Sequence, residues 1–317
     1  MRGTQMHVMV LAGGLSYERD VSLRSGRRVS DALRRVGVET TTVDADADLL
    51  STLHTSQPDA VFIALHGAPG EDGALRGVLD AADVPYVGAA AAESRLAWDK
   101  PVAKTLLRRA GIDTPDWMAL PHETFRELGA AAVLERVVKS IGLPLMVKPV
   151  NGGSGLGATP VFDAGELPAA MMSCFAYGGT ALLERFISGI DVAVSVIDAG
   201  DGPQALPVVE IEPADGVYDY TARYTAGITR WHAPARLSPE KLQQLAEMAL
   251  QAHTTLGLRD LSRMDAIIDT DGRAHVLEVS VSPGMTETSL TPLAVAAADL
   301  DLGIVCRSLV ERAIERR

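Results

Sequence analysis

The stretch "LPLMVKPVNGGSGLGATPV", residues 143–161, decides how the fold of this chain is interpreted. An apolar run that ends at Lys148-Pro149 predicts a strand, and "ATPVFD", which begins at Ala158, predicts a second strand after the glycine-rich segment. A dinucleotide-binding fingerprint needs G-x-G-x-x-G at the start of a helix, and a Walker A loop needs Gly-Lys followed by Ser or Thr. Neither pattern is present, because the glycines read Gly153-Ser-Gly155-Leu-Gly157 and lead into a strand. The segment is therefore either a flexible hairpin without a ligand or a mobile one whose backbone N–H groups and Ser154 close over phosphate oxygens.

Strand and helix patterns alternate from residue 7 to residue 88. The continuous apolar runs "HVMVLAGG" (residues 7–14) and "DAVFIALHG" (59–67) predict buried strands. Between them, "DVSLRSGRRVSDALRRVG" (20–37) has apolar residues at helical spacing. The segment "GALRGVLDAADVPYVG" (73–88) predicts a short helix that leads to a third strand. Such alternation is typical of a parallel α/β unit.

The remainder of the chain predicts a small mixed unit followed by an antiparallel one. Helical patterns cover residues 94–117, ending at Asp113-Thr114-Pro115, and residues 122–141. Two strands are predicted within residues 180–198, and an amphipathic helix is predicted within residues 238–258. We therefore expect three domains, which are an N-terminal parallel α/β domain (1–98), a small middle domain (99–187) and a C-terminal α+β domain (188–317).

The composition excludes several classes of protein. The chain has 317 residues and a formal net charge of −12, from 29 Lys and Arg against 41 Asp and Glu, without a basic run. Nucleic acid is therefore not expected as a partner. Cys174 and Cys306 are the only cysteines, which excludes a disulfide framework and a CxxC metal site. No apolar run approaches the roughly 18 residues of a membrane span, and no leader-like segment begins the sequence, so we expect a soluble cytoplasmic protein without a membrane partner.

The segment "SRMDAIIDTDGRAHVLEVS" (residues 262–280) predicts a hairpin that turns at Thr270-Asp271-Gly272. In such a hairpin, Asp265 on one strand and Glu278 on the other lie side by side. Either acid alone is most simply a solvated strand residue, but two neighbouring carboxylates suit Mg²⁺ bridging ATP phosphates. Arg263 beside them and Lys148 supply the positive charge that phosphoryl transfer needs.

Six collinear segments resemble the D-alanine–D-alanine ligase family of the ATP-grasp superfamily. They are "GGLSYERDVSLRSG", "LHGAPGEDGALRGVLDAADVPYVG", "WDKPVAKTLL", "VKPVNGGSGLG", "VYDYTARYT", and "RMDAIID" with "LEVSVSPGMTETSL", and they extend over almost the whole chain. The second segment is the most specific of them. The resemblance implies a three-domain ATP-grasp fold with ATP between the middle and C-terminal domains. It also implies an ATP-dependent ligase of D-alanine, serving peptidoglycan precursor synthesis, that is a homodimer.

The resemblance further implies roles for individual residues. The implied ATP-binding residues are Lys100, Lys148, Glu184, Phe186, Asp191 and Arg223. The implied catalytic residues are Glu18, Ser154, Tyr224, Arg263 and Gly284. The implied substrate-binding residues are His66, Ser289 and Leu290. The implied ligands of two Mg²⁺ ions are Asp265, Glu278 and Ser280.

Within these sets, Glu18, Ser154 and Tyr224 match a hydrogen-bonded trio that joins mobile segments over the substrates, and Glu18 also holds the ammonium of the first amino acid. A carboxylate is a poor acyl donor, so its oxygen first attacks the γ-phosphorus of ATP to give an acyl phosphate, and a second amine then displaces phosphate. Arg263 and the Gly284 N–H are the candidates to stabilise the oxyanion of that second step.

Three departures from the family pattern leave alternatives open. Ser280 stands where the family usually has asparagine, which weakens the ligand set of the second Mg²⁺, and Arg223 stands where lysine is usual. Asn151-Gly152 and Gly155 replace more polar residues of the glycine hairpin. The alternatives are a related ligase that joins other amino acids in specialised metabolism, and a degenerate paralogue that binds nucleotide without ligation. A nucleotide-dependent oxidoreductase is disfavoured because a strand follows the glycine segment.

Overall fold

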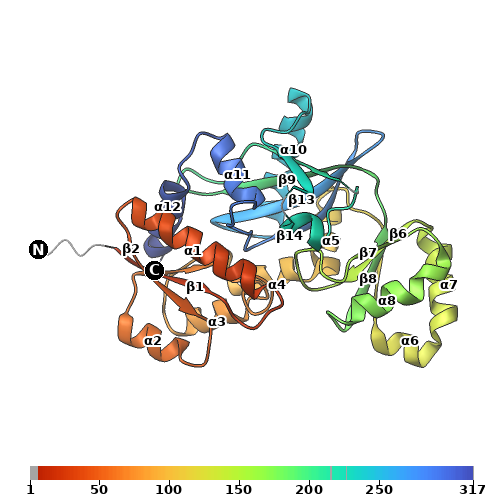
Figure 1. Cartoon of the computed structure of the whole chain (residues 1–317), viewed down its shortest axis with the longest axis horizontal. Coiled ribbons are helices and arrows are strands. Elements are labelled where there is room, and N and C mark those ends of the chain that lie inside the picture. The colour runs from red at the N-terminus through yellow and green to blue at the C-terminus, as the bar shows by residue number, and fades with distance from the viewer. Residues whose placement is uncertain (1–5, 215, 226, 317) are drawn as a thin grey trace, which may run out of the picture.

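The computed structural model describes residues 6–214, 216–225 and 227–316, apart from the side chain of Tyr224. Within these residues, three β-sheets follow one another along the chain (Figure 1). Each sheet has its own helices, and the glycine-rich segment of residues 150–158 belongs to the second sheet, between two of its strands.

The first sheet is parallel, with strand order β2-β1-β3-β4. Its strands are β1 (His7–Ala12), β2 (Glu39–Asp44), β3 (Ala60–Ile63) and β4 (Tyr86–Val87), and its helices are α1 (Arg19–Arg35), α2 (Leu49–Ser56) and α3 (Ala74–Ala81). The predicted parallel α/β unit is confirmed. Strand β2 and helix α2 were not predicted, because β2 is a partly exposed edge strand whose sequence "ETTTVD" lacks an apolar run.

Two helices connect the first sheet to the second. Helix α4 (Ala91–Trp98) and helix α5 (Lys100–Arg109) replace the continuous helical pattern predicted over residues 94–117. The break lies at Asp99, whose side chain accepts a hydrogen bond from the Val102 N–H and so caps α5. Helix α5 ends before Gly111, which has a left-handed φ of 82°, and therefore earlier than Asp113-Thr114-Pro115.

The second sheet is antiparallel, with strand order β5-β8-β6-β7. Its strands are β5 (Trp117–Pro121), β6 (Leu145–Pro149), β7 (Thr159–Val161) and β8 (Thr180–Arg185), and its helices are α6 (His122–Leu128), α7 (Ala130–Ile141) and α8 (Leu167–Phe175). The single helix predicted over 122–141 is wrong. Gly129 divides it, because its φ of 83° lies in the left-handed region that ends a helix.

The third sheet is also antiparallel, with order β12-β11-β9-β13-β14, and β10 pairs with β9. Its strands are β9 (Gly189–Ile197), β10 (Gln204–Ala205), β11 (Val209–Pro213), β12 (Thr229–His232), β13 (Leu261–Asp269) and β14 (Ala274–Ser280). The helices of this part are α9 (Tyr220–Tyr224), α10 (Pro239–Thr255), α11 (Leu290–Ala297) and α12 (Leu302–Glu315). The predicted hairpin of residues 262–280 is confirmed as β13 and β14.

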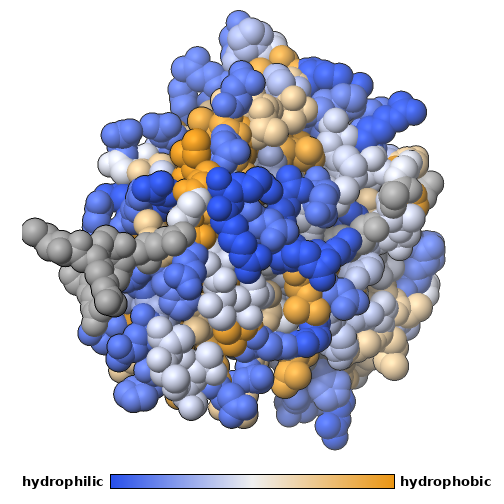
Figure 2. Space-filling view, turned by 60° about the vertical axis from the view of Figure 1, so that its left-hand side comes forward, coloured by the Kyte–Doolittle hydropathy of each residue, from blue (hydrophilic) through white to orange (hydrophobic). Residues whose placement is uncertain are grey.

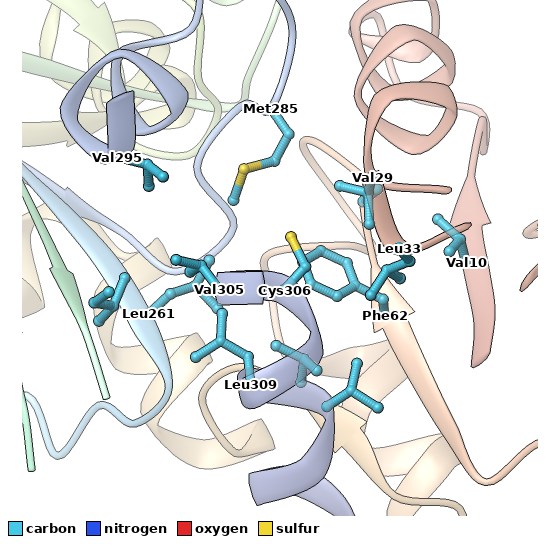
Figure 3. Close-up of a cluster of buried hydrophobic side chains, with 14 of the residues drawn as sticks. Val10, Val29, Leu33, Phe62, Leu261, Met285, Val295, Val305, Cys306 and Leu309 are labelled. Atoms are coloured by element: carbon cyan, nitrogen blue, oxygen red, sulfur yellow. The ribbon is translucent and has the colours of Figure 1, made fainter. Parts of the chain in front are cut away.

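The first and last parts of the chain share one hydrophobic core. Figure 3 shows side chains of α12 against those of α1 and β3, and the labelled residues among them are Val305, Cys306, Leu309, Val29, Leu33 and Phe62. A polar contact lies nearby, where the buried Asp260 carboxylate accepts the Gly88 N–H at 2.7 Å and pairs with Arg316 at 2.5 Å. The N-terminal sheet and the C-terminal elements are therefore packed together.

One face of the molecule shows how polar and apolar residues are distributed on the surface. The face in Figure 2 is largely hydrophilic, with hydrophobic residues in separate patches. Within the described ranges, no helix combines the length and apolar character that a membrane span requires.

Candidate active site

Two cavities meet beside the β13–β14 hairpin. The larger, of about 490 Å³, lies between the second and third sheets, and its size is suited to a nucleotide. The smaller, of about 90 Å³, lies between the N-terminal loop and the C-terminal segments. Both cavities are lined by Lys100, Gly152, Gly153, Tyr218, Arg223 and Glu278. A group bound in one cavity can therefore reach a group bound in the other at this junction.

The hairpin register brings the predicted acidic pair together. Asp265 lies directly opposite Glu278, and Arg263 lies opposite Ser280. Arg263 donates two hydrogen bonds to the Asp265 carboxylate, at 2.6 and 2.7 Å. The Lys100 ammonium lies 3.3 Å from the Glu278 carboxylate. Burial alone would raise the pKa of Glu278. The positive charges of Lys100 and of the other cations near Glu278 outweigh burial, and they lower the pKa of Glu278.

The glycine hairpin is closed against the N-terminal loop. Ser154, at a left-handed φ of 56°, donates a hydrogen bond to the Glu18 carboxylate. Lys100 donates to the Gly152 carbonyl at 2.6 Å. A Cβ at position 153 would lie 3.2 Å from a Glu18 oxygen, so glycine there permits the close approach. Burial is the main cause that raises the pKa of Glu18.

A row of buried polar residues continues from Glu18 into the smaller cavity. His66 makes ring-nitrogen contacts with Ser25 Oγ at 2.9 Å and with the Ser282 carbonyl at 3.1 Å. Burial lowers the pKa of His66 to about 4, so the ring is neutral at pH 7. Glu71 accepts the Gly67 N–H at 3.0 Å, and burial followed by the nearby Glu18 charge raises its pKa.

Glu71 was missed by sequence reasoning, although it lies in the quoted segment "LHGAPGEDG". Its carboxylate also accepts a hydrogen bond from the Ser280 hydroxyl at 3.3 Å. Nothing in the spacing of the segment distinguishes a buried glutamate from an exposed one. Because of its hydrogen bond to Glu71, the hydroxyl of Ser280 is turned toward that carboxylate in this structure.

The far side of the larger cavity is built on β6 and β8. The buried Glu184 carboxylate pairs with Lys148 and, at 2.8 Å, with Lys104. Burial would raise the pKa of Glu184, but the two lysine charges lower it. Burial also lowers the pKa of Lys104 to about 8. Lys104 is a second residue that sequence reasoning did not single out.

The remaining cavity wall contains an aromatic pair and an arginine. The rings of Phe186 and Phe162 meet edge to face at a centroid distance of 5.6 Å. The Arg223 guanidinium lies over the Tyr218 ring at 4.3 Å. Asp191 lines the same cavity, and burial raises its pKa to about 6.

The floor of the smaller cavity is the start of α11. Ser289, immediately before α11, accepts the Thr286 N–H at 3.0 Å through its hydroxyl, and Leu290 is the first helical residue. A Cβ at Gly284 would lie 2.8 Å from the Ser289 hydroxyl oxygen, so any other residue at that position would require Ser289 to move. Tyr224 belongs to α9, but its side chain lies outside the described residues, so the expected trio is described only as the Glu18–Ser154 pair.

Two family models match the chain. The model for the D-ala D-ala ligase C-terminus matches residues 106–315, and the model for the D-ala D-ala ligase N-terminus matches residues 40–89. The D-alanine–D-alanine ligase of Pelotomaculum thermopropionicum is 37% identical over 310 residues, covering 98% of this chain and 97% of the relative. The chain belongs to the D-alanine–D-alanine ligase family. The corresponding enzyme of Nitratidesulfovibrio vulgaris is 42% identical over 308 residues, which cover 96% of this chain and 97% of that enzyme.

Solved structures of the family share the fold. The D-alanine–D-alanine ligase of Bacillus anthracis complexed with ATP superposes with a TM-score of 0.81 at 26% identity, covering 98% of each chain. The VanG D-Ala:D-Ser ligase of Enterococcus faecalis gives a TM-score of 0.82 at 26% identity, covering 98% of this chain and 100% of that one. The ATP-grasp fold and the ligase family expected from the sequence are both confirmed.

In this ligase fold, the predicted site residues surround the two cavities. Lys148, Glu184, Phe186 and Asp191 line the larger one, and Glu18, His66, Arg263, Ser280, Gly284, Ser289 and Leu290 line the smaller one. Ser154 lines the smaller cavity, and Asp265 lines the larger one. Their individual roles remain predictions.

Proposed function

We propose that this ligase activates the carboxylate of one D-alanine as an acyl phosphate at the junction of the two cavities, and then joins it to the amine of a second D-alanine. The single observation that carries this proposal is the junction itself, lined by Lys100, Arg223 and Glu278. The triphosphate enters it from the larger cavity and the amino acids enter it from the smaller one.

The charges at the junction suit phosphoryl transfer to a carboxylate. The D-alanine oxygen attacks the γ-phosphorus and ADP leaves, so anion approaches anion and cations must lie close by. Lys100 is held between the Gly152 carbonyl and Glu278, and Arg223 is held on Tyr218. Because these two cations are already held in place, less free energy is needed to reorganise them during the reaction.

The second step needs a donor for the oxyanion and a site for the incoming amine. The amine attacks the acyl carbon, phosphate departs with the bonding electrons, and the departing phosphate takes up the proton that the amine loses. Arg263 and the Gly284 N–H border the smaller cavity and are our candidate donors. The first ammonium is assigned to Glu18, and the carboxylate of the second amino acid to Ser289 and the start of α11, where a helix N-terminus favours an anion.

The carboxylates of the hairpin fit one Mg²⁺ ion. Asp265 and Glu278 are directly opposite each other and present hard oxygen ligands, and Mg²⁺ is commonly held by one or two carboxylates together with substrate phosphates. Within the described ranges, no cluster of three or more His, Cys, Asp or Glu side chains suited to a metal is found. Bound there, the ion supplies positive charge to the phosphate oxygens. A second ion depends on Ser280, whose hydroxyl is a weaker ligand than an amide carbonyl.

Further assignments belong to this proposal. We place the enzyme in the cytoplasm, where it contributes to peptidoglycan precursors, and we expect it to be a homodimer. We also divide the chain into domains of residues 1–98, 99–187 and 188–317. Size-exclusion chromatography with light scattering tests the dimer, which predicts twice the 33.5 kDa of one chain.

The test of the function is product analysis with ATP, Mg²⁺ and D-alanine, with D-serine and D-lactate in competition. We expect ADP and the D-alanine dipeptide as the main products. The hydroxyl of Tyr224 is proposed to complete a network with Ser154 and Glu18, so Tyr224→Phe is expected to raise the relative rate with D-lactate. A main product containing lactate from the wild type would contradict the proposal.

Other outcomes separate the alternatives. Turnover only with another pair of amino acids would favour a ligase of specialised metabolism. Nucleotide binding without ligation of any pair would favour a degenerate paralogue.

A further inference from the structure

A buried cluster of three charged side chains lies behind the larger cavity. Lys104, on α5, has 1% of its surface exposed, and Glu184, on β8, has 2%. The two carboxylate oxygens of Glu184 bind different lysines, one binding Lys104 at 2.8 Å and the other Lys148. The Lys104 ammonium also lies over the Trp117 ring, at 5.2 Å from its centroid. Lys104 is therefore sealed from solvent and from any ligand.

The net charge of this cluster determines how strongly this side of the cavity attracts an anion. Two ammonium groups and one carboxylate give a net charge of +1 when all three are ionised. Without Lys104, Lys148 and Glu184 would form a neutral pair. Lys148 lines the cavity, and its side chain is 14% exposed, so it is the group through which the remaining positive charge reaches a ligand.

The same helix places a second cation on the other side of the site. Lys100 and Lys104 are four residues apart on α5, and residues at this spacing share one face of a helix. Lys100 binds the Gly152 carbonyl and lies beside Glu278, while Lys104 binds Glu184. Helix α5 therefore contacts the glycine hairpin, the β13–β14 hairpin and the side of the larger cavity that is built on β6 and β8.

We propose that Lys104 is a positioning residue for the ATP phosphates, which acts by compensating Glu184 so that Lys148 keeps its positive charge available to the triphosphate. This inference rests on the proposed function, because it requires nucleotide in the larger cavity. Lys104 itself touches neither ATP nor an amino acid. Its effect is confined to the charged part of the nucleotide.

Nucleotide binding without turnover tests the proposal. Calorimetry measures the affinity of the wild type and of Lys104→Met for adenylyl imidodiphosphate with Mg²⁺, and for adenosine, which has no phosphates. We expect Lys104→Met to weaken the triphosphate analogue about tenfold, which corresponds to one charge acting through partly screened surroundings, and to leave adenosine within about twofold.

Two further variants sharpen the test. The double variant Lys104→Met with Glu184→Gln has one ammonium and no carboxylate, so it has the net charge of the wild type. Because Glu184 lines the cavity itself, the comparison uses the ratio of triphosphate to adenosine affinity, which we expect to lie within about threefold of the wild-type ratio. Arg108→Met is the matched control. Arg108 is on the same helix and lies over the same Trp117 ring at 4.4 Å, but it pairs with Asp116, so its loss should not change triphosphate affinity.

Several outcomes would overturn the proposal. They are an equal loss of adenosine and triphosphate affinity in Lys104→Met, an unchanged triphosphate affinity in that variant, or a double variant whose ratio of triphosphate to adenosine affinity is about tenfold below that of the wild type. If Lys104→Met does not fold, Glu184→Gln decides, because it keeps both lysines and has one more positive charge than the wild type. Its ratio of triphosphate to adenosine affinity should rise about tenfold, and an unchanged ratio would overturn the proposal. A wild type that forms the dipeptide while the variants show none of the expected changes refutes only the role of Lys104. A wild type that binds no nucleotide refutes the proposed function.

Discussion

We predict that acid destabilises this enzyme partly through His66. The unfolded chain protonates this histidine below a pKa of about 6.5, whereas burial lowers the folded pKa to about 4. Between these values the unfolded state binds more protons, so folding stability falls as pH falls from 6.5 to 4. The difference between these two pKa values, at about 1.4 kcal/mol per pH unit, sets an upper limit of about 3 kcal/mol, of which about 2 kcal/mol is already lost at pH 5.

The perturbation that isolates this effect is His66→Gln, since an amide can keep contacts with Ser25 and Ser282 without titrating. Urea unfolding gives the free energy of unfolding of both proteins at pH 7.5 and pH 5.0. Because both proteins share the other six of the seven histidines, their contributions cancel in the comparison. We expect the stability of the wild type relative to the variant to be about 2 kcal/mol lower at pH 5.0 than at pH 7.5. A difference that is the same at both pH values would refute the reasoning.

Three further predictions concern the site and its support. Asp265→Asn keeps the shape of the side chain but removes a charge, and we expect turnover at saturating Mg²⁺ to fall by about 10²–10³, in steady-state assays of ADP formation; wild-type turnover would contradict the metal assignment. Ser280→Asn should lower the Mg²⁺ concentration that gives half-maximal rate, and an unchanged or higher requirement would favour a one-metal reaction or another ligand. Gly73→Ala should lower the free energy of unfolding by more than about 2 kcal/mol, because the new Cβ would lie 2.2 Å from the Ala91 carbonyl oxygen at a left-handed φ of 83°. Urea unfolding measures this loss, and a wild-type midpoint would show that the backbone adjusts.

The parts of the site that could be predicted from sequence are those set by local geometry. The Asp271-Gly272 turn predicts the hairpin, but the register of its first pairs alone would place Asp265 opposite Leu277. A β-bulge between Asp265 and Ala266 shifts the pairing by one residue, and this shift places Asp265 opposite Glu278. The glycine segment between two strands was predicted for a similar reason, since its pattern excludes a helix start.

Other features depend on burial, which a single sequence does not reveal. Lys104 and Glu71 resemble ordinary polar residues of a helix and a loop, and only the packed structure makes them buried. Strand β2 has no apolar run because it is the edge strand of its sheet and is partly exposed. The break at Gly129 was missed because isolated glycines also occur inside helices.

The packing of α12 against the N-terminal sheet has a consequence for the order of synthesis. Val29, Leu33 and Phe62 leave the ribosome before the second and third sheets are made, whereas their partners Cys306 and Leu309 emerge only after both sheets. The N-terminal sheet therefore keeps an uncovered apolar face until α12 has emerged, although domains generally fold as they are synthesised. A chain arrested before residue 302 should be cut by protease within residues 7–88, whereas a released chain that includes α12 should resist cleavage there.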